Sequence, residues 1–168
     1  FLKPLASSIW KDLRIGPCVG KNFFMETRTM KNEVFLDTAF AIALSSPKDH
    51  FHHRAVQLAE QMQKKRIRLV TTRAIIVELG NALSKIRYRK ESIRLIRALE
   101  SDPMIEIIPL SEPIFTKAFQ LYASRPDKEW GITDCISFVV MQEREILEAL
   151  TTDDHFLQAG FQISLKPI

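Results

Sequence analysis

Four carboxylates stand at positions where an enzyme could use them. Asp37 ends the apolar stretch "EVFLD", Asp134 lies near the start of "ITDCISFVV", and Asp153 follows "LEALTT". The fourth, Glu78, lies inside the apolar segment "AIIVELGNAL", so we expect part of its side chain to be buried. A buried carboxylate is costly unless it is paired, hydrogen-bonded or bound to a cation. These acids therefore need an explanation.

Carboxylates that converge on one place repel each other unless a cation lies between them. Oxygen ligands without cysteine or histidine are typical of Mg²⁺ or Mn²⁺ sites. Such an ion generates a nucleophilic water and stabilises charge on a phosphoryl group. Asn81 follows Glu78 by three residues, on nearly the same helix face, and could orient a ligand. The hydroxyls of Thr38 and Thr133 could hydrogen-bond neighbouring acids, as groups around metal ligands do.

Each acid also has an explanation that involves no chemistry. Helix capping would account for Asp37 or Thr38, and equally for Thr133 or Asp134. The sequence "TDD" could form an ordinary turn, and Glu78 could pair with a neighbouring arginine. Taken together, these explanations leave open why the acids fall where a single site would form.

The apolar pattern predicts strands that alternate with helices. Short apolar runs predict strands at 33–37, 67–72, 104–110, 147–152 and 161–165. Helical spacing and capping signals predict helices at 38–46, 50–65, 73–89, 91–101, 111–124 and 132–145. This alternation favours a parallel sheet with helices on both faces. The site of such a sheet lies at the carboxyl ends of its strands, which is where Asp37, Asp134 and Asp153 fall.

The bulk composition fits one globular domain. The chain has 168 residues, of which 46% are hydrophobic and 26% charged, enough for a sizeable core. It contains no apolar run of about 18 residues, so we expect no membrane span. Cys18 and Cys135 are far apart and suggest reduced thiols in a cytoplasmic protein. Residues 1–32 lack periodicity and suggest a poorly ordered extension or a misplaced start, leaving 33–168 as the folded domain.

Positive charge is concentrated in two segments. Residues 1–32 carry six Lys and Arg against two acids, and this accounts for the net charge of +4. Residues 64–97 hold eleven Lys and Arg against two acids. Such a cluster could follow a phosphate backbone, or it could form solvated helix faces. Its candidates for RNA contact are Lys85, Arg87, Arg89 and Lys90.

Four motifs, in this order and spacing, resemble those of the PIN-domain ribonucleases, especially the VapC-like toxins of bacterial toxin–antitoxin pairs and their solitary relatives. They are "VFLDTAFAIAL", "VTTRAIIVELGNALS", "DKEWGITDCISFVVM" and "ALTTDDHFLQAGF". The resemblance runs from about residue 33 to about residue 165. It implies a three-layer α/β/α sandwich with a central parallel sheet and divalent-metal-dependent cleavage of RNA.

The same resemblance assigns roles to the acids. Asp37, Glu78, Asp134 and Asp153 would be the catalytic residues and would hold Mg²⁺ or Mn²⁺, and Asp153 matches better than Asp154. RNA would be the substrate of the protein. Its protein partners would be an antitoxin and a second copy of the chain.

Other interpretations stay open on the sequence alone. The acids could be caps in a non-catalytic module that binds RNA or protein through its basic helices, or the enzyme could cut DNA. The histidines of "HFHH", at positions 50, 52 and 53, suggest a surface or capping role. His155 could contact substrate or pack internally. Tyr88 could stack on a base, or it could be an ordinary surface tyrosine.

Overall fold

The computed structural model describes residues 32–166. The expectation for residues 1–32 therefore lies outside the described residues, apart from Asn32. The strands are β1 (Glu33–Leu36), β2 (Arg68–Thr72), β3 (Ile105–Ile108), β4 (Glu148–Leu150) and β5 (Gln162–Ile163). The helices are α2 (Thr38–Ser45), α3 (His52–Lys64), α4 (Arg73–Ala82), the 3₁₀ turn η1 (Ile86–Tyr88), α5 (Arg89–Ser101), α6 (Glu112–Ser124), α7 (Ile132–Arg144) and α8 (Asp154–Gln158).

The five strands form one parallel sheet in the order β3-β2-β1-β4-β5. β1 lies at its centre, with β2 on one side and β4 on the other. The chain builds outward from β1 to β3, then returns to the other side of β1 for β4 and β5. This reversal places a topological switch point between β1 and β4, where open α/β sheets form their ligand crevice.

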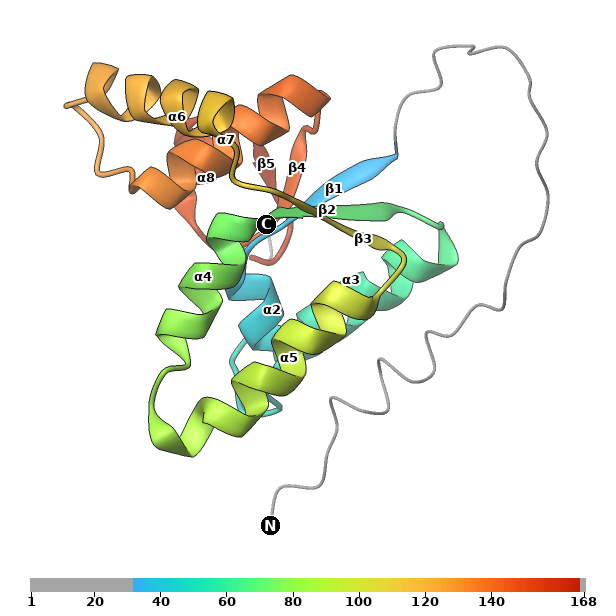
Figure 1. The fold of residues 1–168 in the computed structure, drawn as a ribbon. Coiled ribbons are helices and arrows are strands. Elements are labelled where there is room, and N and C mark those ends of the chain that lie inside the picture. Colours follow the sequence, from blue (N-terminus) through green and yellow to red (C-terminus); the bar gives the residue numbers. More distant parts are fainter. Residues whose placement is uncertain (1–31, 167–168) are drawn as a thin grey trace, which may run out of the picture.

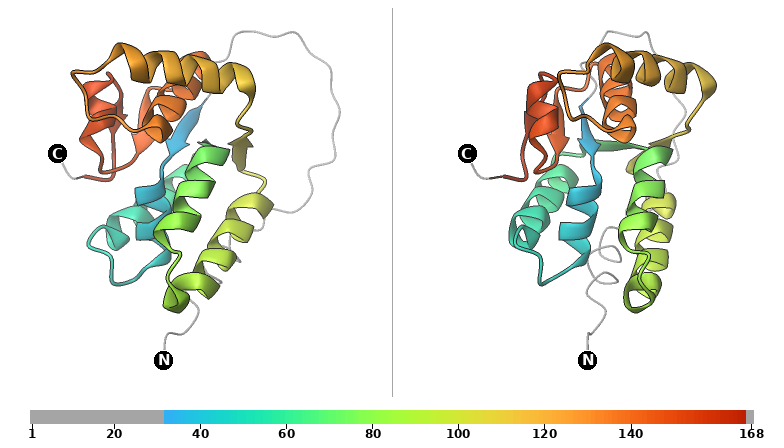
Figure 2. Two further views of the ribbon diagram at one scale, coloured as in Figure 1. Left: turned by 60° about the vertical axis from the view of Figure 1, so that its left-hand side comes forward. Right: turned by 90° about the vertical axis from the view of Figure 1, so that its left-hand side faces the viewer.

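Helices cover both faces of the sheet (Figures 1 and 2). Helices α2, α3 and α5 pack on one face, and α6, α7 and α8 on the other. Because successive strand residues point to opposite faces, Val34 and Leu36 enter the first core and Phe35 enters the second. The predicted three-layer α/β/α sandwich is confirmed.

The α4–α5 region differs from its prediction. The helix predicted at 73–89 ends at Ala82, and a turn separates it from α5, which begins at Arg89. Ile86, an apolar residue inside the predicted helix, is 93% exposed in the structure. In Figure 1, α4 leaves the sheet and α5 returns towards it. A longer α4 would extend past this turn with nothing to cover its apolar stripe.

Arg144, the last residue of α7, ties the amino end of the sheet together. Its guanidinium donates two hydrogen bonds to Glu33 at the start of β1, at 2.7 and 3.0 Å. It donates two more to Glu106 of β3, both at 2.9 Å. One side chain therefore joins a helix to two strands at the edge opposite the carboxyl ends.

Candidate active site

Asp37 lies between β1 and α2, at the carboxyl end of the central strand. It is only 8% exposed, and its Oδ2 accepts a 2.6 Å hydrogen bond from the Thr151 hydroxyl. Burial raises the pKa of Asp37 to about 6, although the Thr151 hydroxyl and the backbone N–H groups of Thr38 and Ala39 lower it. The charge of Glu78 adds to the rise. A cation beside Asp37 would offset the cost of its buried charge.

Glu78 is exposed on α4, and the expectation that it would be partly buried is wrong. The core-facing stripe of α4 consists of Ile75, Ile76 and Leu79, and Glu78 lies at the solvent side of that stripe. Its Oε2 accepts a 2.7 Å hydrogen bond from the Thr38 hydroxyl. The Thr38 hydroxyl thus bonds to an acid on another helix, whereas the Thr38 backbone N–H faces the adjacent Asp37.

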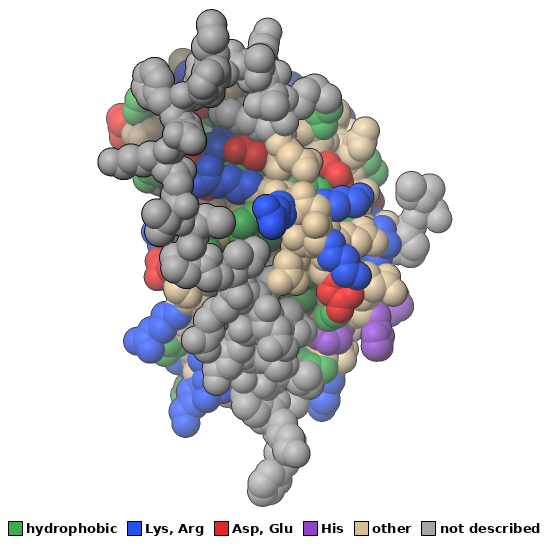
Figure 3. Space-filling model, turned by 90° about the vertical axis from the view of Figure 1, so that its right-hand side faces the viewer, with side chains coloured by type: hydrophobic (Ala, Val, Ile, Leu, Met, Phe, Trp, Pro, Cys, Tyr) green, Lys and Arg blue, Asp and Glu red, His purple; other side chains and the backbone are tan. Residues whose placement is uncertain are grey.

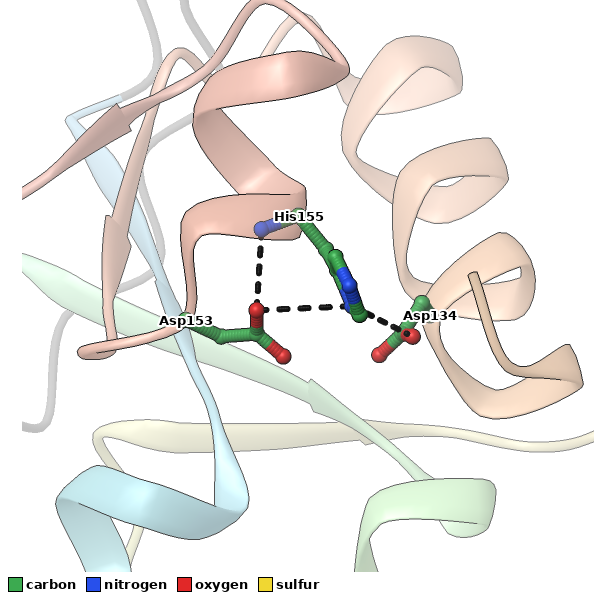
Figure 4. A group of neighbouring side chains, drawn as sticks. All are labelled: Asp134, Asp153 and His155. Atoms are coloured by element: carbon green, nitrogen blue, oxygen red, sulfur yellow. Dashed lines mark hydrogen bonds and ion pairs between the residues drawn. The ribbon is translucent and has the colours of Figure 1, made fainter. Parts of the chain in front are cut away.

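Asp134 and Asp153 face each other from two elements of the opposite helix layer. Asp134 lies in the first turn of α7, where its Oδ2 accepts the Gly131 N–H at 2.8 Å. Asp153 precedes α8 and caps it, with its Oδ1 accepting the His155 N–H at 2.8 Å. The capping role considered for Asp134 is therefore real, and Asp153 caps a helix where an ordinary turn was considered. Both carboxylates are turned towards one point (Figure 4).

His155 lies between the two carboxylates in Figure 4. Its Nδ1 is 3.4 Å from Asp134 Oδ2 and 3.4 Å from Asp153 Oδ1. Burial raises the pKa of Asp134, and the charge of Asp153 adds to the rise. The Gly131 N–H and His155 lower it. The sequence did not distinguish a site role for His155 from packing, and the structure places it within the acidic group.

Thr151 joins the two halves of the site. It is fully buried, donates to Asp37, and accepts the Asp153 N–H at 3.0 Å. Sequence reasoning missed this residue. Its signal was its place two positions before Asp153, the first acid of the "TTDD" motif, on a strand predicted to pair within the sheet.

A pocket of about 310 Å³ lies between α4, α7 and the start of α6, and Glu78 is the one of the four acids that lines it. Its lining includes Arg73, Val77, Glu78, Asn81, Phe115 and Thr133. Asn81 is exposed on the same face of α4 as Glu78. Thr133 lines the pocket, and no hydrogen bond from its hydroxyl to an acid is found in residues 32–166. Arg73 pairs with Glu100 at 2.6 Å, so it is not the partner of Glu78.

The four RNA-contact candidates lie away from the acids. Lys85, Arg87, Arg89 and Lys90 are exposed on the turn between α4 and α5, at the end of α4 remote from the sheet (Figure 1). The wider basic segment is not continuous, since Arg68 pairs with Glu106 at 3.3 Å. On the face drawn in Figure 3, Lys and Arg side chains are separated by Asp, Glu and other side chains.

The donor set fits a divalent cation. Asp134, Asp153 and His155 each offer a ligand atom, and these atoms lie within 4.8 Å of one another. The His155 Nδ1 is buried without a hydrogen-bond partner. Two carboxylates and a ring nitrogen that makes no hydrogen bond, all aimed at one point, are a ligand set that a divalent ion satisfies.

The family model of the PIN domain matches residues 34–162. The chain belongs to the PIN domain family. That match covers β1 through β5, so the family recognised from the four motifs is confirmed.

Solved structures share the fold of this PIN domain at low sequence identity. VapC20 of Mycobacterium tuberculosis, described as a sarcin–ricin loop cleaving toxin, aligns with a TM-score of 0.66 and 20% identity, covering 76% of this chain and 95% of VapC20. FitAcB of Neisseria gonorrhoeae aligns at 0.58 and 20% identity, covering 77% and 95%. VapBC2 of Rickettsia felis, bound to a DNA fragment from its promoter, aligns at 0.58 and 13% identity, covering 78% and 96%. No curated protein matches the chain by sequence.

These likenesses establish the fold. Within residues 32–166, no helix combines the length and the apolar composition that a membrane span requires.

Proposed function

We propose that this PIN-domain protein is an endoribonuclease that hydrolyses RNA phosphodiester bonds with bound Mg²⁺ or Mn²⁺. One observation carries the proposal. Thr151 connects buried Asp37 to Asp153, which faces Asp134, so acids from both helix layers meet at the carboxyl ends of β1 and β4. That crevice is where a parallel sheet of this order binds its ligand.

In this proposal three acids share one role and the fourth acts separately. Asp37, Asp134 and Asp153 would hold the metal ion, and Glu78 would act from the wall of the pocket. The ion, when bound, would activate water and stabilise negative charge on the phosphoryl group. Thr151 keeps the Asp37 carboxylate in place, and the Thr38 hydroxyl does the same for Glu78.

The pocket beside Glu78 supports a path for the RNA strand. It opens next to the acids and is lined by Asn81, which can donate and accept hydrogen bonds. Beyond the end of α4, Lys85, Arg87, Arg89 and Lys90 would contact phosphates of the same strand. The separation of these basic residues from the acids fits a substrate several nucleotides long.

The test is RNA cleavage by the full chain with Mg²⁺ or Mn²⁺ and with EDTA. The substrates are a sarcin–ricin loop oligonucleotide, because VapC20 is described as cleaving that loop, other structured and unstructured RNAs, and DNA of the same sequences. We expect metal-dependent cleavage of RNA that yields 5′-phosphate ends. Asp134→Asn should abolish it, because that carboxylate faces Asp153 across the proposed metal position.

Asp154→Asn is the matched control. Asp154 is adjacent to Asp153, but it is exposed and pairs with Lys166 at 2.7 Å, so this variant should cleave normally. Metal-independent RNA binding that survives Asp134→Asn, without cleavage of any substrate, would instead support the non-catalytic binding module. Cleavage of DNA alone would support the deoxyribonuclease.

An antitoxin partner in the cytoplasm forms part of the same proposal. The nearest physical target for an inhibitor is the acidic mouth with its adjoining pocket, which a basic or polar segment would cover. Co-expression of a small neighbouring gene should relieve any growth arrest that this protein causes. Persistent arrest would favour the solitary nuclease.

We also propose a homodimer through an apolar face centred on α6. Phe115, Phe119 and Tyr122 lie at positions i, i+4 and i+7, so they form one stripe, and each is 41–54% exposed. Leu110 and Val77, 45% and 58% exposed, extend the stripe across the pocket wall. Half-exposed side chains of this size leave on the order of 400 Å² of apolar surface in water.

That area suits a second copy of the chain. A standard interface buries about 800 Å² per partner, of which roughly 60% is apolar. A stripe beside a pocket is also self-complementary, because the ridge of one copy can enter the groove of the other under two-fold symmetry. The second copy would then close one side of the substrate pocket.

A further inference from the structure

His155 is placed for a more specific task than packing. Its side chain is 27% exposed, yet the Nδ1 atom is buried and makes no hydrogen bond. The ring is turned so that Nδ1 faces both Asp134 and Asp153 (Figure 4). A buried ring nitrogen that makes no hydrogen bond but lies 3.4 Å from two carboxylate oxygens is either the charged partner of those acids or a ligand of an ion that they share.

The spacing of the three groups suits a shared ion. Nδ1 lies 3.4 Å from one oxygen of each carboxylate. Two ligand atoms at right angles around an ion, each about 2.1 Å from it, lie about 3 Å apart. The observed spacing needs only a small side-chain shift to reach this value. The backbone N–H of His155 also donates a hydrogen bond to Asp153 Oδ1, which fixes the position of the histidine relative to that acid.

We propose that His155 Nδ1 is a ligand of the same ion as Asp134 and Asp153, so that this site takes Mn²⁺ in preference to Mg²⁺. The inference rests on the proposed metal-dependent function and names the ligand set of its site. The histidine would be neutral, with its proton on Nε2 and the Nδ1 lone pair directed at the ion.

The preference for Mn²⁺ follows from ligand chemistry. Mg²⁺ is bound almost entirely by oxygen and releases its water reluctantly. Imidazole suits transition metals, and affinity for them rises from Mn²⁺ along the first row. Replacing one oxygen ligand by a ring nitrogen therefore favours the binding of Mn²⁺ over the binding of Mg²⁺.

The rival explanation is an ion pair, in which protonated His155 neutralises the two acids and competes with the metal. The two explanations predict opposite effects of removing the ring. Loss of a ligand weakens Mn²⁺ binding, whereas loss of a competing cation strengthens it. The difference can be measured without RNA.

The experiment is titration of the metal-free full chain with Mn²⁺ or Mg²⁺ by calorimetry, combined with pulsed electron paramagnetic resonance of bound Mn²⁺. We expect ¹⁴N coupling to the manganese from a histidine ligand. His155→Ala should remove this coupling and weaken Mn²⁺ binding by about 10–100-fold, with a much smaller effect on Mg²⁺. His155→Asn should retain Mg²⁺ binding but lose the manganese preference, because its amide offers an oxygen.

His53→Ala is the matched control. The chain has four histidines, and His53 is exposed on α3, on the other helix layer. This variant should keep both the coupling and the preference. Wild-type protein without nitrogen coupling, or His155→Ala with equal or tighter Mn²⁺ binding, would overturn the inference.

Asp134→Asn in the same titration separates this inference from the proposed function. If that variant loses both ions while His155→Ala keeps the wild-type preference, the metal site stands and only the histidine role fails. If Asp134→Asn binds both ions as the wild type does, the acidic site is not a metal site. The proposed function and the inference then both fail.

Discussion

Asp37 carries a charge in a place that water hardly reaches. The pKa of Asp37 is about 6, against 3.8 for an ordinary aspartate. The folded protein therefore binds the carboxyl proton of Asp37 more tightly than the unfolded chain does. The stability that the proton provides is present below about pH 4 and is lost as the pH rises through 6. The shift corresponds to about 3 kcal/mol in the free energy of unfolding.

We therefore expect Asp37→Asn to stabilise the metal-free protein at neutral pH. Urea unfolding in EDTA should show the variant about 3 kcal/mol more stable than wild type at pH 7.5. The gap should shrink towards pH 4, where Asp37 is protonated and resembles asparagine. Exposed Asp154→Asn serves as the control and should show a small gap at every pH. A wild type more stable than the variant at pH 7.5 would contradict the burial argument.

Thr151 is expected to act through Asp37. Thr151→Val keeps the shape of the side chain but removes the donor, so the pKa of Asp37 should rise further. Metal binding should then weaken by about 10–100-fold, as for other groups that orient metal ligands. Thr151→Ser keeps the hydroxyl and should bind metal almost as the wild type does. Titration with Mn²⁺ measures the metal affinity of both variants. An unchanged affinity of Thr151→Val would count against the proposed action of Thr151 through Asp37.

At the scale of elements, the sheet and most helices could be predicted because their signals are local. Val34, Phe35 and Leu36 form a continuous apolar run, which predicts a strand buried on both faces, and their side chains do enter the two cores alternately. Helix α8 was missed because its five residues are too few to show a helical period. Its cap, Asp153, was noticed only as an acid.

The sequence predicted which residues form the candidate site, but it did not predict which of their side chains contact one another. The sequence placed Asp37, Asp134 and Asp153 at one edge of the sheet because that follows from strand and helix order. It could not show that Thr151 bonds to Asp37 across 114 positions, because spacing carries no information on such a pair. Glu78 shows the same limit, since a position beside an apolar stripe can face either core or solvent.

Arg144 gives the element-scale prediction. Its removal would leave Glu33, whose side chain is 6% exposed, and Glu106 without this cation at the amino end of the sheet. Breaking a buried ion pair by deleting one partner typically costs 3–5 kcal/mol. We expect Arg144→Ala to lower the free energy of unfolding by about 3 kcal/mol and to leave metal affinity unchanged.

Lys117→Ala is the comparison for Arg144→Ala. Lys117 pairs with Glu143 on the surface, where both side chains are well exposed, so its loss should cost under about 1 kcal/mol. Chemical denaturation measures the loss in the free energy of unfolding for each of the two variants. Equal effects would mean that the Arg144 cluster is no stronger than a surface pair.

At the scale of the whole molecule, the α6 face gives a testable assembly. Phe119→Lys places a charge in the centre of the stripe and should convert a dimer into a monomer, as measured by sedimentation velocity. Leu147→Lys changes another exposed apolar residue, 69% exposed just before β4, and should leave the dimer intact. A wild-type monomer at tens of micromolar (on the scale of weak association) would contradict the proposed interface.

The position of β4 next to β1 has a consequence for synthesis of the protein. Phe35 pairs with Ala149 in the sheet, so β1, the first strand of the described residues, gains its neighbour β4 only after residues 148–150 have been made. A nascent chain that has emerged only through β3 carries Asp37 and Glu78, but it has no Thr151, Asp153 or His155. Under the proposed function, an unfinished chain therefore could not cut the messenger that encodes it. Under that proposal, the order of the strands would delay nuclease activity until β4 and α8 have been made.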